Sequence, residues 1–263
     1  MEDSKKENGI IINFAKDFNS EEEMQHFYLE YGFVCLKQFI PKDLIENIVE
    51  DLKFIFSPYS TDNLNPIDSG ILNLDKADKK LLHKLHLSLQ KSTAVRSMPN
   101  IFRNIISSIN EDKTPVLDIF SGLLLGISKD DRLVYNFHQE SNYYREAFSD
   151  ITVVHYPLLR TSKPENGTMS ILPGSHKLGT LDYDKSQKSN NSYTTLIPKN
   201  MSKIVDKFPE FHCYLEVGDV ILLNKDLIHK SNYNSSELCR IVASHRLTQS
   251  ISGEWEMLTA EDL

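Results

Sequence analysis

The sequence predicts a fold that is mainly β, with helices gathered in its N-terminal part. Two patterns along the 263 residues support this prediction. Between Ser20 and Ile109, apolar residues recur three or four positions apart, as they do in amphipathic helices. From Val116 onward, short apolar runs are separated by Gly, Pro, Asn and Asp, as in the strands and turns of a β-sandwich or barrel. The expected order is therefore a helical segment followed by a β core.

Length and composition fit one globular domain. A chain of this size is suited to one large core rather than two separate ones, so we expect a single domain over residues 1–263. Its helical buttress would lie mainly within 1–115 and its β core mainly within 116–250. Hydrophobic residues make up 40% and charged residues 25%, and no apolar run approaches the roughly 20 residues needed to cross a bilayer. We therefore expect a soluble protein without a membrane partner.

Charge, cysteine content and the N-terminus indicate the class of partner and the compartment. A net charge of -8 without a basic stripe argues against nucleic acid as a partner. The stretch MEDSKKENGIIINF mixes both charge signs and lacks the apolar region of a secretory signal. Three cysteines without a CxxC pair, namely Cys35, Cys213 and Cys239, fit reduced thiols better than a disulfide framework. We expect a cytoplasmic protein that acts on a small molecule.

The first predicted elements form a helix-strand-helix unit. Ser20, with Glu23 three residues later, is a capping box ahead of the helical pattern MQHFYLEY, and Gly32 ends that helix. Residues 33–40 are β-branched and aromatic enough for a strand. Pro41 then opens a second helix, KDLIENIVEDLKFIF, whose apolar residues form one stripe.

The remaining elements follow the same two patterns. Residues 57–73 are rich in turn formers, and helical patterns cover roughly 76–91 and 93–109. The expected strands, in order, are GLLLGIS, RLVYNFH, DITVVHYPLL, TMSILPG, FHCYLEV, DVILLN and RIVASHRL. Residues 181–200 are polar and nearly without pattern, which is unusual in a compact domain unless the loop is functional. We interpret them as a mobile flap over a site.

A candidate metal site begins at His138 and Glu140. If residues 138–140 lie in a strand, these two side chains point to the same face, because strand side chains alternate. An imidazole and a carboxylate would then lie side by side as two metal ligands. With 9 His and 37 acidic residues in the chain, however, such a triplet arises about once by chance. The pair gains meaning only from the residues that follow it.

Three downstream residues complete the pattern. His229 follows the strand-like DVILLN, Ser231 lies two residues later, and Arg240 comes eleven residues after His229 at the start of another strand. Two His and one carboxylate form a facial triad, which leaves adjacent positions on Fe(II) free for a bidentate keto acid and dioxygen. A buried guanidinium can bind the distal carboxylate of 2-oxoglutarate, and a neighbouring hydroxyl can share it. We assign these two roles to Arg240 and Ser231.

The order and spacing of these motifs resemble the phytanoyl-CoA dioxygenase family of Fe(II)/2-oxoglutarate oxygenases. The resemblance covers most of the chain, from YGFVCLKQFIPKDLIENI to IVASHRL. The segments that carry it are the N-terminal helix-strand-helix, His138-Gln139-Glu140, Asn166-Gly167 followed by ILPGSHKLG, VGDVILLNKDLIHKS, and Arg240.

The resemblance implies a fold, a set of site residues and a reaction. The fold is a double-stranded β-helix, that is, a jelly-roll or cupin-like core of two sheets behind the N-terminal helices. The site residues it implies are the metal ligands His138, Glu140 and His229, the 2-oxoglutarate-binding residues Arg240 and Ser231, and the active-site aromatic Tyr156. The reaction converts 2-oxoglutarate and dioxygen to succinate and CO2 while a small-molecule substrate is hydroxylated.

Glu140 departs from the family pattern, since the carboxylate ligand there is usually the shorter Asp. A catalytically weak or inactive binding protein on the same fold therefore stays open as an alternative. A metal-dependent isomerase or hydrolase on a cupin-like barrel is a third, but it would have little need of a buried Arg240. The halogenating relatives replace the carboxylate with a small residue, so Glu140 argues against halogenation.

Several polar residues near these motifs have a simpler interpretation. Four histidines lie on or beside strands without a matching acidic neighbour, so we interpret them as packed or surface residues; they are His155, His176, His212 and His245. Residues 142–145 follow the metal motif and either line the substrate cavity or form a surface loop.

Overall fold

The computed structural model describes residues 18–111, 115–131, 134–144, 150–183 and 196–249. Within them, helices precede and surround two antiparallel sheets, and helical residues outnumber strand residues. The prediction of a mainly β fold therefore overestimates the share of strand residues, and the chain has a mixed architecture of helices and sheets. The order, with helices first and strands afterwards, agrees with the sequence pattern. None of the described helices has the length and apolar character needed to span a membrane.

The first two helices begin and end where their capping residues predict. Helix α1 (Glu21–Tyr31) starts after Ser20, whose side chain accepts the backbone N–H of Glu23, and ends at Gly32 with a φ of 79°. Helix α2 (Lys42–Phe56) follows Pro41 and buries one apolar stripe. Strand β1 between them is Phe33–Leu36, shorter than predicted.

The segment predicted as turn-rich contains a helix that the sequence pattern hides. Residues Ser57–Tyr59 form a 3-10 turn and Pro66–Ala77 form helix α3. Pro66 occupies the first turn of α3, where its missing N–H costs nothing, so this proline starts a helix rather than breaking one. The other helices are α4 (Lys79–Leu89), α5 (Thr93–Ser97), α6 (Pro99–Asn110) and α7 (Met201–Lys207). The two later predicted helices are thus divided, at Asp78 and at Met98.

The strands form one large and one small antiparallel sheet. The large sheet has the order β1-β6-β3-β8-β2, and the small one has the order β5-β4-β7. Their bounds are β2 Leu117–Gly126, β3 Thr152–Pro157, β4 Met169–Ile171, β5 Phe211–His212, β6 Val220–Asn224, β7 His229–Ser231 and β8 Arg240–Thr248. RLVYNFH is not a strand: residues 132–133 lie outside the described residues, and the rest contributes only an isolated bridge at His138.

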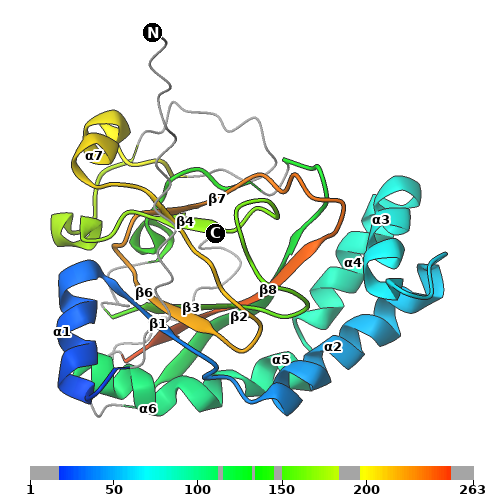
Figure 1. Cartoon of the computed structure of the whole chain (residues 1–263), viewed down its shortest axis with the longest axis horizontal. Coiled ribbons are helices and arrows are strands. Elements are labelled where there is room, and N and C mark those ends of the chain that lie inside the picture. Colours follow the sequence, from blue (N-terminus) through cyan, green and yellow to red (C-terminus); the bar gives the residue numbers. More distant parts are fainter. Residues whose placement is uncertain (1–17, 112–114, 132–133, 145–149, 184–195, 250–263) are drawn as a thin grey trace, which may run out of the picture.

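The two faces of the large sheet have different neighbours. Its outer face packs against the helices, where Tyr156 and Ala243 share a core with Leu52 and Phe102. Its inner face packs against the small sheet, and the core between them is built from residues of both, for example Val153 and Met169. Figure 1 shows α1, α6, α5 and α2 along one side of the large sheet, with α3 and α4 at its β2 end. Helix α7 lies on the other side, near β4.

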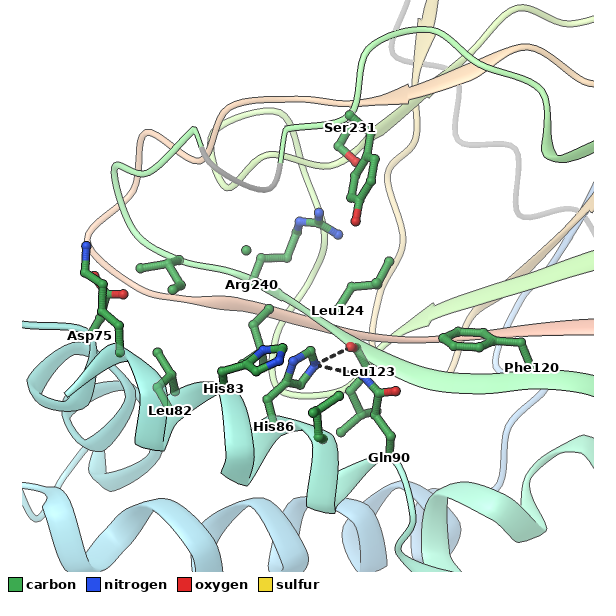
Figure 2. Close-up of a pocket in the computed structure, with 16 residues that line it drawn as sticks. Asp75, Leu82, His83, His86, Gln90, Phe120, Leu123, Leu124, Ser231 and Arg240 are labelled. Carbon is green, nitrogen blue, oxygen red and sulfur yellow. Dashed lines mark hydrogen bonds between the residues drawn. The ribbon is translucent and has the colours of Figure 1, made fainter. Parts of the chain in front are cut away.

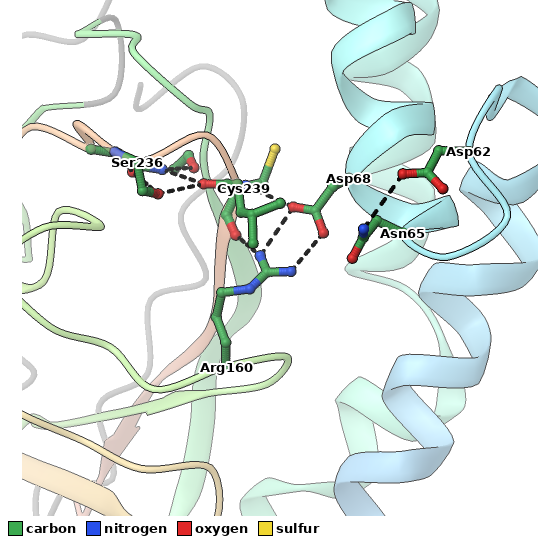
Figure 3. A network of polar contacts seen from close by, with 9 residues as sticks. Asp62, Asn65, Asp68, Arg160, Ser236 and Cys239 are labelled. Carbon is green, nitrogen blue, oxygen red and sulfur yellow. Dashed lines mark hydrogen bonds and ion pairs between the residues drawn. The ribbon is translucent and has the colours of Figure 1, made fainter.

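An ion pair joins α3 to the start of β8. Arg160 donates to both carboxylate oxygens of Asp68, with N–O distances of 3.0 and 2.6 Å, and also to the carbonyl of Cys239. Asp68 in addition accepts the backbone N–H of Cys239 at 2.7 Å. Figure 3 shows the three residues facing one another between the helix and the strand. The side chain of Asp68 is only 5% exposed, so this network fixes the backbone directly before Arg240.

Replacing Asp68 by Ala should destabilise the protein by about 3 kcal/mol, because it leaves the mostly buried guanidinium of Arg160 without its carboxylate partner and the buried N–H of Cys239 without an acceptor. Urea unfolding measures the effect as a lower midpoint. Glu46→Ala is the matched control, since it breaks the exposed pair with Lys42 on α2 and should cost less than about 1 kcal/mol. Equal losses in the two variants would contradict the structural role of the Asp68 network.

A second polar network is buried on the outer face, around His245. Ser121 donates its hydroxyl proton to Asp118, so its oxygen accepts from Nδ1 of His245 at 2.7 Å. Nε2 of His245 then accepts the hydroxyl proton of Tyr156 at 2.9 Å. Burial, together with the charge of the nearby Arg246, lowers the pKa of His245 to about 3. The imidazole is therefore neutral in the folded state.

His245 should make stability depend on pH. Its folded pKa lies below the unfolded value, so only the unfolded chain binds the proton as pH falls from about 6.5 toward 3. The stability present above pH 6.5 is thus lost over this range, by up to about 1.4 kcal/mol per pH unit for one proton. We expect His245→Gln to reduce the slope of the unfolding free energy against pH by up to that amount. The same substitution at His26, exposed on α1, is the matched control; a slope in His245→Gln as steep as that of the wild type would refute the assignment.

Candidate metal centre

Three predicted ligands meet between the two sheets. One ligand atom from each of His138, Glu140 and His229 lies within 4.8 Å of the other two, and all three residues are buried. The two histidines form a short antiparallel bridge, in which each backbone N–H donates to the other's carbonyl, at 3.0 and 3.1 Å. Their ring centroids are 4.2 Å apart. The bridge joins the loop before Glu140 to strand β7.

Glu140 does not lie in a strand, contrary to the expectation for residues 138–140. It begins a 3-10 helix, Glu140–Tyr143, while Gln139 before it has an extended backbone (φ -115°, ψ 140°). That single extended residue is enough to bring Glu140 and His138 to the same side. Gln139 itself is fully buried: its Nε2 donates to the carbonyls of Gly179 and Asp226, and its Oε1 accepts the N–H of Leu181. These bonds hold the segment 138–140 against Gly179, Leu181 and Asp226.

Hydrogen bonds leave the same nitrogen of each histidine free. Nδ1 of His138 donates to the carbonyl of Asn136 at 2.7 Å, and Nδ1 of His229 donates to that of Leu227 at 2.9 Å. Because a carbonyl only accepts, Nδ1 carries the proton and Nε2 has its lone pair available for a metal. Burial lowers the pKa of His138 to about 3 and also lowers that of His229. Both imidazoles are neutral, as metal ligation requires.

Glu140 is held by an arginine that the sequence analysis did not identify. Arg246 donates from Nε to Oε1 at 2.7 Å and from Nη2 to Oε2 at 3.1 Å, a bidentate ion pair. Burial alone would raise the pKa of Glu140, but the charge and hydrogen bonds of Arg246 outweigh it and hold the pKa below its usual value. Oε2 lies 3.9 Å from Nε2 of His229, so the ionised carboxylate faces the two imidazoles.

Arg240 enters the same cavity with its charge uncompensated by the described residues. Its side chain is buried, and its Nε and Nη1 have no hydrogen-bond partner there. Gly126 on β2 makes room for it, since a Cβ at that position would lie 3.3 Å from Cβ of Arg240. Burial lowers the pKa of Arg240 to about 10, so the guanidinium is charged at neutral pH. Ser231, on β7, lines the cavity beside it.

The cavity continues past Arg240 toward helix α4. The part that contains the metal ligands has a volume of about 340 Å³, and an adjoining part of about 490 Å³ shares Tyr135, Ser231 and Arg240 with it. Figure 2 shows Ser231 and Arg240 on one side of β2, with His83 and His86 of α4 on the other. Nε2 of His86 donates to the carbonyl of Leu123 at 2.6 Å. The cavity therefore passes over the edge strand of the large sheet.

Tyr156 is not part of this site, and its neighbour His155 is. Tyr156 points to the outer face and binds His245, whereas the residues lining the cavity include His155, whose Nε2 has no partner within the described part of the chain. Strand alternation explains the difference, because adjacent residues face opposite sides. The same alternation along β8, from Arg240 through Ser244 to Arg246, would have identified Arg246 from the sequence. The interpretation of His155 as a plain packed residue missed its place at the site.

One described end of the predicted flap contacts a residue that lines the cavity, while residues 184–195 are outside the described residues. Tyr183 and Pro198 form an isolated bridge, and the backbone N–H of Leu196 donates to the hydroxyl of Tyr143 at 3.1 Å. Tyr143 and Tyr144 line the cavity, so this part of the 142–145 loop belongs to the site. Arg145 is not among the described residues.

The sequence is similar to known proteins over most of its length. The sequence profile of the family described as Phytanoyl-CoA dioxygenase (PhyH) matches residues 28–242. The "Phytanoyl-CoA dioxygenase, peroxisomal" of Mus musculus is 24% identical over 234 residues, which cover 88% of this chain and 62% of the mouse protein. The chain thus spans less than two thirds of that relative. A Caenorhabditis briggsae protein, "Phytanoyl-CoA dioxygenase domain-containing protein 1 homolog", is 25% identical over 253 residues, 81% of this chain and 83% of its own.

Solved structures share the fold at low sequence identity. EvdO2 from Micromonospora carbonacea var. aurantiaca, complexed with 2-oxoglutarate, has a TM-score of 0.60 at 12% identity over 90% of this chain and 94% of its own. The epimerase SnoN, in complex with Fe3+, alpha ketoglutarate and nogalamycin RO, has a TM-score of 0.57 at 13% identity over 87% and 83%. These likenesses concern the fold alone. Because the family profile extends over most of the chain, this protein belongs to the phytanoyl-CoA dioxygenase family.

Proposed function

We propose that this protein is an Fe(II)- and 2-oxoglutarate-dependent dioxygenase that hydroxylates a small molecule. The observation that carries the proposal is the buried guanidinium of Arg240, whose Nε and Nη1 have no partner among the described residues. A buried charge is costly unless it is paired, so the cavity is suited to an anion at this point. The same cavity holds two neutral imidazoles and an ionised carboxylate, the donor set of non-haem iron oxygenases.

Each residue has a role in this proposal. His138, Glu140 and His229 would hold the iron through Nε2 and carboxylate oxygens, with their orientations set by the hydrogen bonds described above. Arg240 would bind the distal carboxylate of 2-oxoglutarate bidentately, and the Ser231 hydroxyl would donate to it. Bound iron supplies the activation of dioxygen that is coupled to conversion of 2-oxoglutarate to succinate and CO2. Apolar side chains of the cavity, such as Leu124 and Val153, would keep water away from the reacting groups.

The fold supports the same assignment. We interpret the facing sheets as the two halves of a double-stranded β-helix within one domain, with the helices before residue 115 as its buttress. Leu196, within the 181–200 segment, contacts Tyr143 of the cavity lining, which fits a flap over the substrate side of the cavity. Because the structural relatives include a protein named as an epimerase, hydroxylation is the part of the proposal that needs a product to be identified.

The rival functions make different demands on Arg240. A hydrolase or isomerase that uses a metal-bound water has no need of an unpaired buried guanidinium beside the metal. A catalytically weak binding protein remains the second candidate, and the observation in its favour is that Arg246 already engages both carboxylate oxygens of Glu140. Chelation of 2-oxoglutarate by the bound iron, and not metal binding alone, separates it from the first candidate.

The test is to add Fe(II) and then 2-oxoglutarate to the apoprotein without oxygen, and to record the weak visible charge-transfer band of a chelated keto acid. We expect a band in the wild type. His229→Ala should lose it because a metal ligand is missing. Arg240→Ala should lose it at moderate 2-oxoglutarate concentrations because the distal carboxylate has no anchor, which costs several kcal/mol in a buried charged pair.

Two variants serve as controls for this experiment. Arg103→Ala removes an exposed arginine on α6 and should leave the band unchanged. Tyr156→Phe should also retain it, since Tyr156 faces away from the cavity. Fe(II) uptake without any band in the wild type would favour the binding-protein function, and an unchanged band in Arg240→Ala would exclude the role given to that residue.

A further inference from the structure

Arg246 occupies a position that the metal ligands and the 2-oxoglutarate anchor do not explain. It lies on β8, on the same inner face as Arg240 and six residues after it, opposite Val153 of β3. Its side chain is only 14% exposed. Both oxygens of Glu140 accept from it, at 2.7 and 3.1 Å. Unlike Arg240, it is therefore fully engaged with the protein.

Other side chains hold Arg246 itself in place. Its Nη1 donates to the hydroxyl of Ser244 at 2.6 Å, and a hydrogen bond joins it to Tyr144. The guanidinium carbon lies 5.4 Å from the centre of the Phe120 ring, within the range of a cation-π contact. A guanidinium held on three sides has one orientation, and a bidentate pair transmits that orientation to the carboxylate it binds.

The ion pair leaves Glu140 able to bind a metal. An ionised carboxylate has about four lone-pair sites, and Arg246 uses one on each oxygen. The remaining sites include those on Oε2, which lies 3.9 Å from Nε2 of His229. The family usually has Asp at this position, and the extra methylene of Glu140 adds a rotatable bond that must be fixed before the carboxylate can act as a ligand.

We propose that Arg246 is a positioning residue, which holds the longer Glu140 side chain in the one orientation that completes the metal site. This inference rests on the proposed function and concerns how this chain accommodates Glu where relatives have Asp. Two effects compete, because the charge of Arg246 repels a metal cation while its hydrogen bonds orient the ligand. The proposal states that orientation is the larger effect.

The experiment is calorimetric titration of the apoprotein with Co(II), a redox-stable probe, without 2-oxoglutarate. We expect Arg246→Met to bind Co(II) 10 to 100 times more weakly, on the order of the loss seen when such outer partners are removed. Arg246→Lys keeps the charge but cannot form two parallel bonds, so its loss should be smaller than that of Arg246→Met. Glu140→Asp should also bind more weakly than the wild type, because the shorter carboxylate cannot reach both Arg246 and the metal.

A double-mutant cycle distinguishes positioning from a general structural effect. In a Glu140→Ala background, Arg246→Met should cause no further loss of Co(II) affinity, because Arg246 would act only through Glu140. Arg103→Met, at an exposed arginine, is the matched control and should bind as the wild type does. If circular dichroism shows that Arg246→Met does not fold, the Co(II) affinities of Arg246→Lys and Glu140→Asp test the proposal instead.

The possible outcomes are separable. Unchanged or tighter Co(II) binding by Arg246→Met would overturn the inference and identify Arg246 as a competitor of the metal. An equal loss in the Glu140→Ala background would also overturn it, since Arg246 would then act independently of Glu140. If the wild type itself binds neither Co(II) nor Fe(II), the proposed function fails and the inference fails with it, whereas weaker binding in Arg246→Met alone supports both.

Discussion

The two-residue alternation of strand β8 is the constraint on which the rest of this molecule depends. Its odd-numbered residues, such as Ile241 and Ala243, are buried against the helices, and three of its even-numbered residues line the cavity. One strand therefore carries the hydrophobic core on one face and both buried guanidinium groups on the other. A shift of one residue in the pairing of β8 would exchange these environments, which makes the register with β2 and β3 decisive for both stability and the site.

Among the N-terminal helices, α3 contributes to the site through this strand. Asp68 on α3 binds the backbone of Cys239, the residue immediately before Arg240, and Arg160 closes the network. The sheet thus sets the direction of the Arg240 side chain, and the helix sets where the strand begins. A residue more than 170 positions away in the sequence is in this way coupled to the proposed 2-oxoglutarate anchor.

Much of this arrangement could be predicted, and the errors have physical reasons. The three metal ligands could be predicted because the His-x-Glu motif and the later histidine each follow an apolar, strand-like run. Helix α3 was missed because Pro66 and the polar residues around it are typical of a turn. Tertiary packing, which the local sequence does not reveal, favours the helix. Tyr156 was misplaced because the face of a strand depends on its partners and not on its own residues. Alternation along β8 places Arg246 on the face of Arg240, but its role was not predictable, because its partner Glu140 is 106 positions away.

The hydrogen bond from His86 to the Leu123 carbonyl has a consequence for solubility. Strand β2 is an edge strand, and its part from Phe120 to Gly126, FSGLLLG, is mostly apolar and uncharged, which is the type of segment that pairs with another chain when it is exposed. Helix α4 lies against this edge, and His86 occupies one of its free backbone acceptors. The same helix that borders the cavity therefore also protects the sheet from intermolecular pairing and aggregation.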